Sequence, residues 1–303
     1  MVINYLPYQQ VDKQKWDACI DQADNGLVYA YSFYLDAMSK HWDGLILGDY
    51  EVVMPLTWSK KYGVHYLYQP FFTASLGIFG KNISAVLVNA FLKAVPAKFK
   101  YWDIYLNHGN YFEQANFKLY DRVNYVLPLN ESYETIYAKY RDNIKRNIKK
   151  TARLNCVIKK NINIDQVIFL AKEQAKKFSL ITSADYDHFK KVYQYLQGLN
   201  KATAYGICMP ADELVASCAL FFSHQRIYYI LVGNHPNGKT IGASHALIDA
   251  FIRDHAGQNL TVDFEGSDIK NVAFFYSSFG AREEKYPGIQ VNRLPKILQL
   301  FKK

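Results

Sequence analysis

Strand-like and helix-like segments alternate along the chain, and this alternation constrains the fold more than any other feature of the sequence. The clearest strands are residues 214–223 and 226–233, two apolar runs joined by His224 and Gln225, which predict a β-hairpin. Hairpins that alternate with amphipathic helices are typical of mixed α/β sheets covered by helices. Because each half of the 303 residues follows this plan, we expect two similar α/β domains, each with a mixed α+β sheet, in tandem.

The periodicity of apolar residues predicts the order of the elements. We expect strands at 2–6, 45–47, 51–58, 64–68, 102–106, 123–127, 156–160, 203–208, 214–223, 226–233, 260–264 and 290–294. We expect helices at 12–23, 32–41, 84–99, 134–153, 165–177, 184–199, 242–256, 272–279 and 296–301. Pro128 and Asn130 interrupt the pattern, so we predict an N-terminal domain at 1–128 and a C-terminal domain at 129–303.

Composition excludes several classes of protein. Half of the residues are hydrophobic, which excludes a disordered chain. No apolar run reaches about 18 residues, and the N-terminus has no basic stretch followed by an apolar one, so we expect neither a transmembrane segment nor a secretory signal. The four cysteines form no CxxC pair, and no cluster has the spacing of metal ligands. These features predict a cytoplasmic protein with reduced cysteines and no metal.

One segment carries almost all of the net positive charge. Residues 139–160 hold nine Lys or Arg residues and one acid, so they contribute +8 of the formal net charge of +9. In the helix expected at 134–153, one stripe is apolar and a second stripe is basic. The apolar stripe is Ile136, Tyr140, Ile144, Ile148 and Ala152, and the basic one is Arg141, Lys145 and Lys149, flanked by Arg146, Lys150 and Arg153.

Like charges four residues apart on a helix repel one another. A helix with several such pairs either contacts a bound anion or exposes its basic face to solvent, where counterions reduce the repulsion. The candidate anions are a phosphate-bearing cofactor, a nucleotide-linked substrate, RNA and an anionic membrane surface.

A loop rich in glycine follows the hairpin and leads into a helix. Backbone amides at a helix N-terminus are unpaired, and the helix dipole favours negative charge there. Glycine also lets a pyrophosphate approach the backbone closely. Most loops of this kind bind nothing, but this one could bind an anion through Val232, Gly233, Lys239, Gly242, Ala243 and Ser244.

Three segments together resemble the FemAB-like and BioF2-like branch of the acyl-CoA N-acyltransferase (GNAT) superfamily. They are the basic helix KYRDNIKRNIKKTARLN, the segment GASHALIDAFIRDHAGQNLTVDFEGSD, and FFYSSFGA, which is similar to a family F-K-x-x-F-G pattern with Tyr276 at the lysine position. The first half resembles the N-terminal half of the same group. The resemblance implies two tandem GNAT-like domains, with the last strand and helix (about 286–303) returning to the first domain.

The resemblance also implies an activity. The superfamily's pyrophosphate loop, [R/Q]-x-x-G-x-[G/A], aligns with Lys239, Gly242 and Ser244, of which only Gly242 fits strictly. The implied enzyme is an N-acyltransferase that moves an acyl or aminoacyl group to an amine, with acyl-CoA favoured as donor over aminoacyl-tRNA. The long helical arm that some tRNA-dependent members carry has no counterpart here. The implied acceptor is a small molecule, or a glycan or peptide precursor in cell-envelope or polysaccharide biogenesis.

Acyl transfer needs a proton acceptor for the amine and a proton donor for the leaving group. Asp263 and Glu265 flank Phe264 in the strand expected at 260–264, so both would point to one face, where either could act as the base or hold the substrate ammonium. Tyr276 could protonate a leaving thiolate. In the first half, Tyr68 and Gln69 could line an acceptor groove. Each of these residues could instead have a purely structural role. Asp263 could hydrogen-bond to the backbone of the following loop, Tyr276 could be a core side chain, and Tyr68 and Gln69 could pack within their loop.

A second hypothesis needs no catalysis. The same fold could be a catalytically inactive binding module that holds a phosphate-bearing ligand or RNA through residues 139–160. The sequence leaves open whether the chain is an enzyme, whether the first domain has its own site, and what the oligomeric state is, because fold alone does not determine function.

Overall fold

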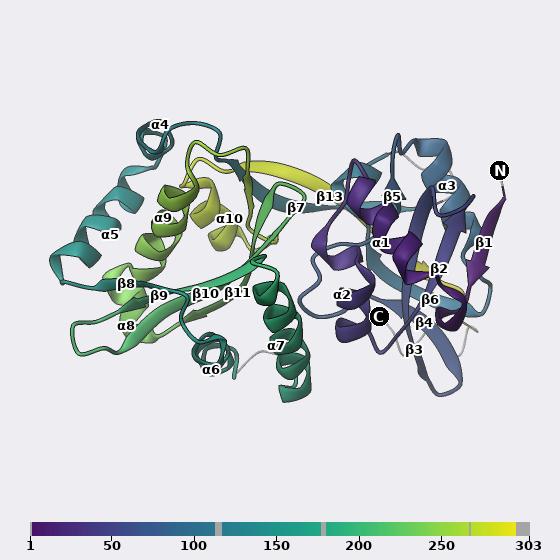
Figure 1. The fold of residues 1–303 in the computed structure, drawn as a ribbon, viewed down its shortest axis with the longest axis horizontal. Coiled ribbons are helices and arrows are strands. Elements are labelled where there is room, and N and C mark those ends of the chain that lie inside the picture. Colours follow the sequence, from purple (N-terminus) through teal and green to yellow (C-terminus); the bar gives the residue numbers. More distant parts are fainter. Residues whose placement is uncertain (1, 113–116, 177–179, 267, 295–303) are drawn as a thin grey trace. The chain divides into compact units, whose positions relative to one another are not determined.

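The computed structural model describes residues 2–112, 117–176, 180–266 and 268–294 (Figure 1). The chain forms two compact units, Met1–Arg122 with Lys285–Lys303, and Val123–Glu284. The boundary expected between 128 and 129 falls at the end of β7 (Leu119–Pro128), a strand that contributes residues to both units. The helix expected at 296–301 lies outside the described residues.

Unit 1, Met1–Arg122 with Lys285–Lys303, is built on a sheet with strand order β1-β2-β3-β4-β6-β13. The strands are β1 (Ile3–Leu6), β2 (His41–Leu47), β3 (Val52–Lys61), β4 (Val64–Tyr68), β6 (Phe99–Tyr105) and β13 (Arg282–Asn292), and β5 (Phe79–Gly80) pairs with β3. The helices are α1 (Lys13–Gln22), α2 (Ser32–Met38) and α3 (Ala85–Ala94), with short 3-10 turns at Tyr8–Gln10, Val28–Ala30 and His108–Asn110. Phe91, Phe99 and Trp102 lie at the centre of its core.

Unit 2, Val123–Glu284, has strand order β7-β12-β11-β10-β9-β8. Its remaining strands are β8 (Val157–Lys160), β9 (Ala202–Cys208), β10 (Leu214–Ser223), β11 (Arg226–Asn234) and β12 (Thr261–Asp263). Figure 1 shows one face of this sheet covered by α4 (Tyr133–Ala138), α5 (Asp142–Arg153), α9 (Ala243–His255) and α10 (Lys270–Ser277), and the other by α6 (Ile164–Ala175) and α7 (Ser183–Gly198). The expected hairpin is confirmed as β10 and β11.

The basic segment forms two helices, so the single helix predicted at 134–153 is wrong. The chain turns between α4 and α5, where Arg141 adopts an extended conformation and its N–H donates to the carbonyl of Ser278 at 2.9 Å. The turn shifts the buried face of α5, so that Thr151 is buried and the predicted Ala152 is exposed. A contact remote in the sequence thus overrides the local four-residue pattern.

The loop predicted before residue 242 contains a helix, α8 (Pro236–Ile241), that the sequence analysis missed. Pro236 is suited to the first helical position, and the Nδ1 atom of His235 caps the helix by accepting from the N–H of Asn237 at 3.2 Å. Gly238 is required for packing, because a Cβ atom there would lie 2.1 Å from the carbonyl oxygen of Val215 on β10. The Asn-Gly pair therefore marks a helix packed against the sheet and not a turn.

Three smaller predictions need correction. The helix predicted at 84–99 ends at Ala94, because Pro96 follows and β6 already begins at Phe99. The last strand begins at Arg282, eight residues before the predicted start at 290, and pairs with β6 from Gly288 to Asn292. The second helix ends at Met38, and His41 already begins β2.

Candidate functional site

The strands β11 and β12 pair over only three residues, and this leaves one side of β11 open. Arg226, Ile227 and Tyr228 pair in parallel with the three residues of β12, which ends at Asp263. Beyond Tyr228, β11 continues to Asn234 with β10 on one side and, among the described residues, no strand on the other. We call this stretch, residues 229–234, the open side of β11.

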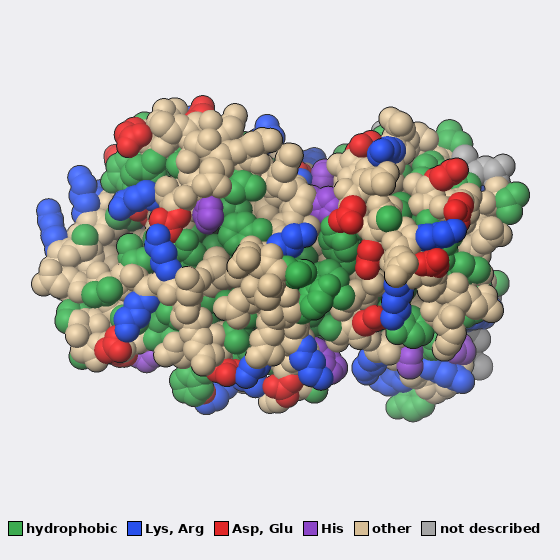
Figure 2. Space-filling model, viewed as in Figure 1, with side chains coloured by type: hydrophobic (Ala, Val, Ile, Leu, Met, Phe, Trp, Pro, Cys, Tyr) green, Lys and Arg blue, Asp and Glu red, His purple; other side chains and the backbone are tan. Residues whose placement is uncertain are grey.

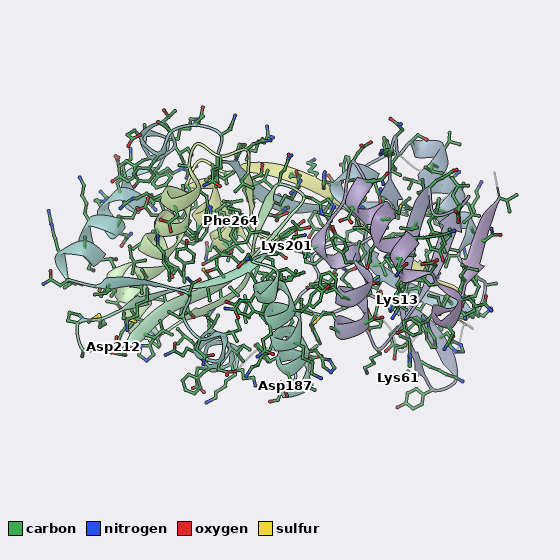
Figure 3. The ribbon with its side chains drawn as sticks, viewed as in Figure 1. Lys13, Lys61, Asp187, Lys201, Asp212 and Phe264 are labelled. Atoms are coloured by element: carbon green, nitrogen blue, oxygen red, sulfur yellow. The ribbon has the colours of Figure 1, made fainter. Side chains whose placement is uncertain are left out.

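An aromatic cluster lies beside the open side of β11. Phe264, which directly follows β12, stacks on Tyr276 of α10, with ring centroids 4.5 Å apart and an interplanar angle of 16° (Figure 3 labels Phe264). Tyr229 of β11 presents its ring edge-on to both, at 6.0 Å and 6.4 Å. Tyr276 is therefore held rigidly, and its hydroxyl makes no hydrogen bond to any residue that the structure describes.

Burial and the charge of Glu265, in that order, raise the pKa of Tyr276 above its ordinary value of 10. Tyr276 is therefore protonated at neutral pH and can donate a hydrogen bond or a proton. The charge of Glu265 thus acts on the phenol of Tyr276 through space.

Asp263 has a different environment. Its Oδ1 atom accepts from the side chain of Asn124 at 2.7 Å and from the N–H of Glu265 at 2.9 Å, and its Oδ2 atom accepts from Arg226 at 2.9 Å. Arg226 also binds both carboxylate oxygens of Glu284, at 2.9 Å and 2.8 Å. Both oxygens of Asp263 are thus engaged in a buried ion-pair network that ties together β7, β11, β12 and β13.

The expectation that Asp263 and Glu265 point to the same face of a strand is wrong. The strand ends at Asp263, and Glu265 lies in the left-handed backbone region with φ of 65°. Glu265 accordingly lies on a turn that leaves the sheet, while Asp263 stays inside the network around Arg226.

The junction between α8 and α9 is the second part of the site. Gly242 connects the two helices with φ of 80°, and a Cβ atom at this position would lie 2.7 Å from the Cβ of Asn147 on α5. Thr151 and Lys150 of α5 reach the same junction, at 3.0 Å from the carbonyl oxygen of Ile241 and 2.9 Å from that of Thr240. The basic helix α5 therefore makes hydrogen bonds to the glycine-containing segment around Gly242, which the sequence analysis had treated as a separate feature.

The remaining predicted loop residues lie in different environments. Ala243 is buried at the start of α9, and Ser244 donates from its hydroxyl to the side chain of Asn234 at 2.5 Å. Gly233 faces α6, because a Cβ there would lie 2.6 Å from the amide nitrogen of Ala171, and its neighbour Val232 is half-buried on β11. Lys239 is exposed on α8. Lys239, Gly242, Ala243 and Ser244 are thus near the junction, whereas Gly233 serves the packing of α6.

His245, in the first turn of α9, links the junction to the aromatic cluster. Its ring meets Phe275 edge-on at 4.9 Å, and its Nε2 atom lies 3.4 Å from the side-chain nitrogen of Asn147. Its Nδ1 atom is buried with no hydrogen-bond partner among the described residues. Burial lowers the pKa of His245, so the ring is neutral at pH 7.

The predicted basic residues do not form one uniform stripe. Arg146, Lys149, Lys150 and Arg153 are exposed on α5, and blue side chains project where α5 lies in Figure 2. Lys145 is half-buried and donates to the carbonyl of Ala138 at 3.1 Å.

Arg141 lies over the ring of Phe274 on α10, with its guanidinium carbon 4.6 Å from the ring centroid. We call the five residues with exposed charge the α5 basic surface: Arg141, Arg146, Lys149, Lys150 and Arg153. Through Arg141 and Lys150, this surface touches both α10 and the junction.

Tyr68 and Gln69 belong to unit 1 and hold its loops. The hydroxyl of Tyr68 accepts from the N–H of Lys40 at 2.9 Å. The Gln69 side chain donates to the carbonyl of Thr73 at 2.9 Å and accepts from the N–H of Tyr105 at 3.1 Å. Their proposed role in an acceptor groove stays a prediction.

Sequence reasoning missed Asn147, Thr151 and Arg226. The signal for the first two was a polar stripe of Asn143, Asn147 and Thr151, with the same four-residue spacing as the basic stripe. Arg226 had no local signal, because its partners come from other strands. Among the described residues, no group of three or more His, Cys, Asp or Glu side chains could hold a metal ion, and no helix is long and apolar enough to cross a membrane.

Solved structures with the same architecture identify the fold. FemX superposes with a TM-score of 0.67 at 12% identity and covers 100% of both chains. L-PGS from Bacillus licheniformis gives 0.58 at 13% identity, over 96% of this chain and 95% of the other. The C-terminal domain of a proposed lysylphosphatidylglycerol synthetase from Agrobacterium fabrum gives 0.53 at 10% identity, over 96% and 95%.

The chain has the FemAB-like fold. The predicted pair of tandem GNAT-like units and the resemblance to the FemAB-like branch are thereby confirmed at the level of fold. No family model and no curated protein matches the sequence.

Proposed function

We propose that the chain is an acyltransferase that moves an acyl or aminoacyl group from an anionic carrier to an amine. The observation that carries this proposal is the arrangement in unit 2. A protonated phenol, Tyr276, and a carboxylate, Glu265, lie beside the open side of β11, and the α5 basic surface contacts both α10 and the junction. A proton donor, a proton acceptor and a cationic surface are the three elements that such a transfer needs.

We propose an ester-linked aminoacyl group, carried by tRNA, as the first donor to test, and acyl-CoA as the second. Tyr276 is protonated at neutral pH and can donate a hydrogen bond to either leaving group, so the choice between the two donors depends on the surface around it.

The proposed reaction conserves protons at the site. The amine nitrogen forms a bond to the acyl carbon, and the ester C–O bond breaks. The leaving oxygen takes the proton of Tyr276, while Glu265 accepts the proton that the nitrogen releases, and solvent water then carries that proton from Glu265 to the Tyr276 phenolate. Both side chains end the cycle in their starting states.

Two points support the tRNA donor. The α5 basic surface carries four exposed cations on the 12-residue helix and a fifth, Arg141, directly before it, more than the two phosphates of a pyrophosphate require. The Agrobacterium fabrum domain, which has the same fold, comes from a protein named as a proposed lysylphosphatidylglycerol synthetase. A glycan or peptide precursor with a free amine remains our proposed acceptor class.

Two parallel assays on the full chain test this proposal. One follows loss of labelled amino acid from aminoacylated tRNA, and the other follows thiol release from acetyl-CoA and longer acyl-CoAs, each with simple primary amines as acceptors. Amine-dependent turnover with tRNA alone supports the first donor, and turnover with acyl-CoA alone replaces it by the second. Binding of tRNA or CoA without turnover in either assay would establish the inactive binding module instead.

A further inference from the structure

One end of the sheet in unit 1 gathers cations that are far apart in the sequence. In the strand order β2-β3-β4-β6-β13, the start of β2, the hairpin between β3 and β4, the start of β6 and the end of β13 all lie at this end. Figure 2 shows Lys and His side chains gathered there, in the region labelled by Lys61 in Figure 3. Six exposed cations make up what we call the basic end of unit 1: Lys40, Lys60, Lys61, Lys98, Lys100 and Arg293.

The protein itself does not balance this positive charge. The stretches that form this end, residues 40–43, 58–65, 98–101 and 291–294, contain the six cations and one acid, Asp43, and so carry a net charge of +5. Asp43 is buried, and its carboxylate lies 3.6 Å from Lys98. Asp36 of α2 is already engaged by Lys13 at 2.7 Å. The other five cations of the basic end form no ion pair with any residue that the structure describes.

The half-buried His65, at the start of β4, senses this charge. Burial lowers the pKa of its imidazole, and the charges of Lys60 and Lys98 lower it further. The carboxylate of Asp43 acts in the opposite direction, but its effect is smaller than theirs. The end of the sheet is therefore electropositive even beside its one buried acid.

An aromatic residue that the fold does not require lies at the tip of the hairpin between β3 and β4. Tyr62 and Gly63 both have positive φ, 49° and 81°, as in the two-residue turns that join tightly paired strands. Asn adopts such a conformation with less strain than Tyr, so the turn does not account for the tyrosine. The core does not account for it either, because Tyr62 is 91% exposed, more than any other large apolar side chain in the described part of the chain.

Three features of this end favour a broad anionic surface, the headgroup layer of a lipid bilayer, over a nucleic acid. The cations come from the ends of adjacent strands, which lie about 4.8 Å apart, so the array is about 20 Å wide. Five of the six are lysines, whose compact charge attracts anionic headgroups without the paired geometry with which arginine binds nucleic-acid phosphates. Tyrosine, which has an apolar ring and a polar tip, is enriched at membrane–water interfaces.

We infer that the basic end of unit 1 docks onto a membrane that contains anionic lipids, with Tyr62 at the level of the headgroups. The attraction is electrostatic, so docking is reversible and weakens as salt screens the charges. This inference concerns unit 1 alone. It does not depend on the proposed transferase function, which uses the α5 basic surface of unit 2.

Co-sedimentation of the full chain with lipid vesicles tests the docking. At low salt, the chain should bind vesicles of phosphatidylcholine that contain about one third phosphatidylglycerol, and it should not bind pure phosphatidylcholine. Each lysine near such a surface contributes about fivefold to partitioning, so Lys60→Gln with Lys61→Gln should lower it about 25-fold. Failure of the wild type to bind the anionic vesicles at low salt would overturn the inference.

Matched variants test which surface docks. Lys191→Gln with Lys201→Gln removes the same charge from two exposed lysines of unit 2 and should lower partitioning less than about threefold, because distant charges are screened. Arg146→Gln with Lys149→Gln makes the same change on the α5 basic surface and should also have only this small effect. A loss in either control pair as large as that in the hairpin pair would contradict docking through the basic end of unit 1.

Tyr62 reports the contact directly. In Tyr62→Trp, the emission of the added indole, measured as the difference from the wild type, should shift to shorter wavelength with anionic vesicles and should be quenched by brominated lipids. Vesicle binding without either change would mean that another surface docks, and would overturn the inference.

Filter binding of tRNA distinguishes a membrane from RNA as the partner of this end. Lys60→Gln with Lys61→Gln should reduce vesicle binding more than tRNA affinity. A larger loss for tRNA than for vesicles would make the basic end of unit 1 an RNA surface and would reject the membrane.

Discussion

A Cβ atom on Gly242 would lie 2.7 Å from the Cβ of Asn147, so the junction between α8 and α9 touches the basic helix α5 at van der Waals limits. The contact brings together two features that are far apart in the sequence, the cationic segment and Gly242. It also means that the glycine serves a packing role, whether or not an anion binds beside it.

Gly242→Ala should therefore destabilise unit 2 for two reasons. A left-handed conformation costs a non-glycine residue about 1–2 kcal/mol, and the added carbon collides with Asn147. Gly257→Ala is the matched control, because Gly257 has φ of 79° but nothing within 4 Å of its Cβ position. Urea denaturation should show a larger loss of unfolding free energy at Gly242. Equal losses at the two sites would mean that the contact with Asn147 contributes nothing.

Asp263 and Glu265 should respond differently to removal of their charge. Asp263→Asn breaks a buried pair with Arg226, which should cost about 3 kcal/mol of unfolding free energy. Glu265→Gln should lower the denaturation midpoint less than Asp263→Asn and should reduce kcat, since Glu265 accepts the amine proton in the proposed reaction. Chemical denaturation and initial rates on the two variants measure this contrast. A stable Asp263→Asn variant with lost turnover would instead make Asp263 the base.

Much of the secondary structure is predictable from the sequence, because it depends on neighbours along the chain. The hairpin of β10 and β11 and the strand β4 follow from local alternation, and their ranges match the prediction within one residue. The break between α4 and α5 is not predictable in this way, because it depends on a hydrogen bond from Arg141 to Ser278.

The same limit applies to the candidate site. Sequence reasoning selected Glu265, Tyr276 and Gly242, which the structure places on the elements around the open side of β11. It could not separate Asp263 from Glu265, because the residues that engage Asp263, Asn124 and Arg226, come from β7 and β11.

Tyr276→Phe removes the proposed proton donor and little else. The ring still stacks on Phe264, so the fold should be retained, while kcat should fall about 10²-fold with KM nearly unchanged. Because the pKa of Tyr276 is raised, activity that depends on its proton should persist above pH 10 in the wild type. Glu265→Gln removes one of the two causes that raise the pKa of Tyr276. The activity that remains in this variant should therefore fall at a lower alkaline pH than the activity of the wild type. A wild-type rate in Tyr276→Phe would exclude the phenol from the chemistry.

The α5 basic surface should determine binding of a polyphosphate ligand. Arg146→Glu with Lys149→Glu reverses two exposed charges that the structure leaves outside any hydrogen bond among the described residues. Each lost phosphate contact should reduce the slope of log affinity against log salt by about 0.7–0.9. The control is Lys61→Glu with Lys93→Glu, which makes the same change in net charge within unit 1. Filter binding of tRNA at several salt concentrations should give a smaller slope for the α5 double variant than for the unit 1 double variant. Equal slopes would mean that the α5 basic surface makes no phosphate contacts.

Asp249 should make the stability of unit 2 depend on pH with a defined sign. It is buried on α9, accepts from Tyr133 and Arg253 at 2.9 Å each, and has a pKa raised above 3.8 because burial outweighs these partners. A raised carboxyl pKa stabilises the fold fully below pH 3.8, and that stabilisation is lost as pH rises through the folded-state pKa.

The stability of the wild type relative to Asp249→Asn should therefore be greatest near pH 4 and should decline toward pH 7. Urea denaturation of both proteins between pH 4 and 7 measures this difference, and Asp187→Asn, at an exposed acid on α7 labelled in Figure 3, is the control that should show no such trend. A difference that instead grows with pH would mean that Tyr133 and Arg253 dominate over burial and hold Asp249 as a carboxylate.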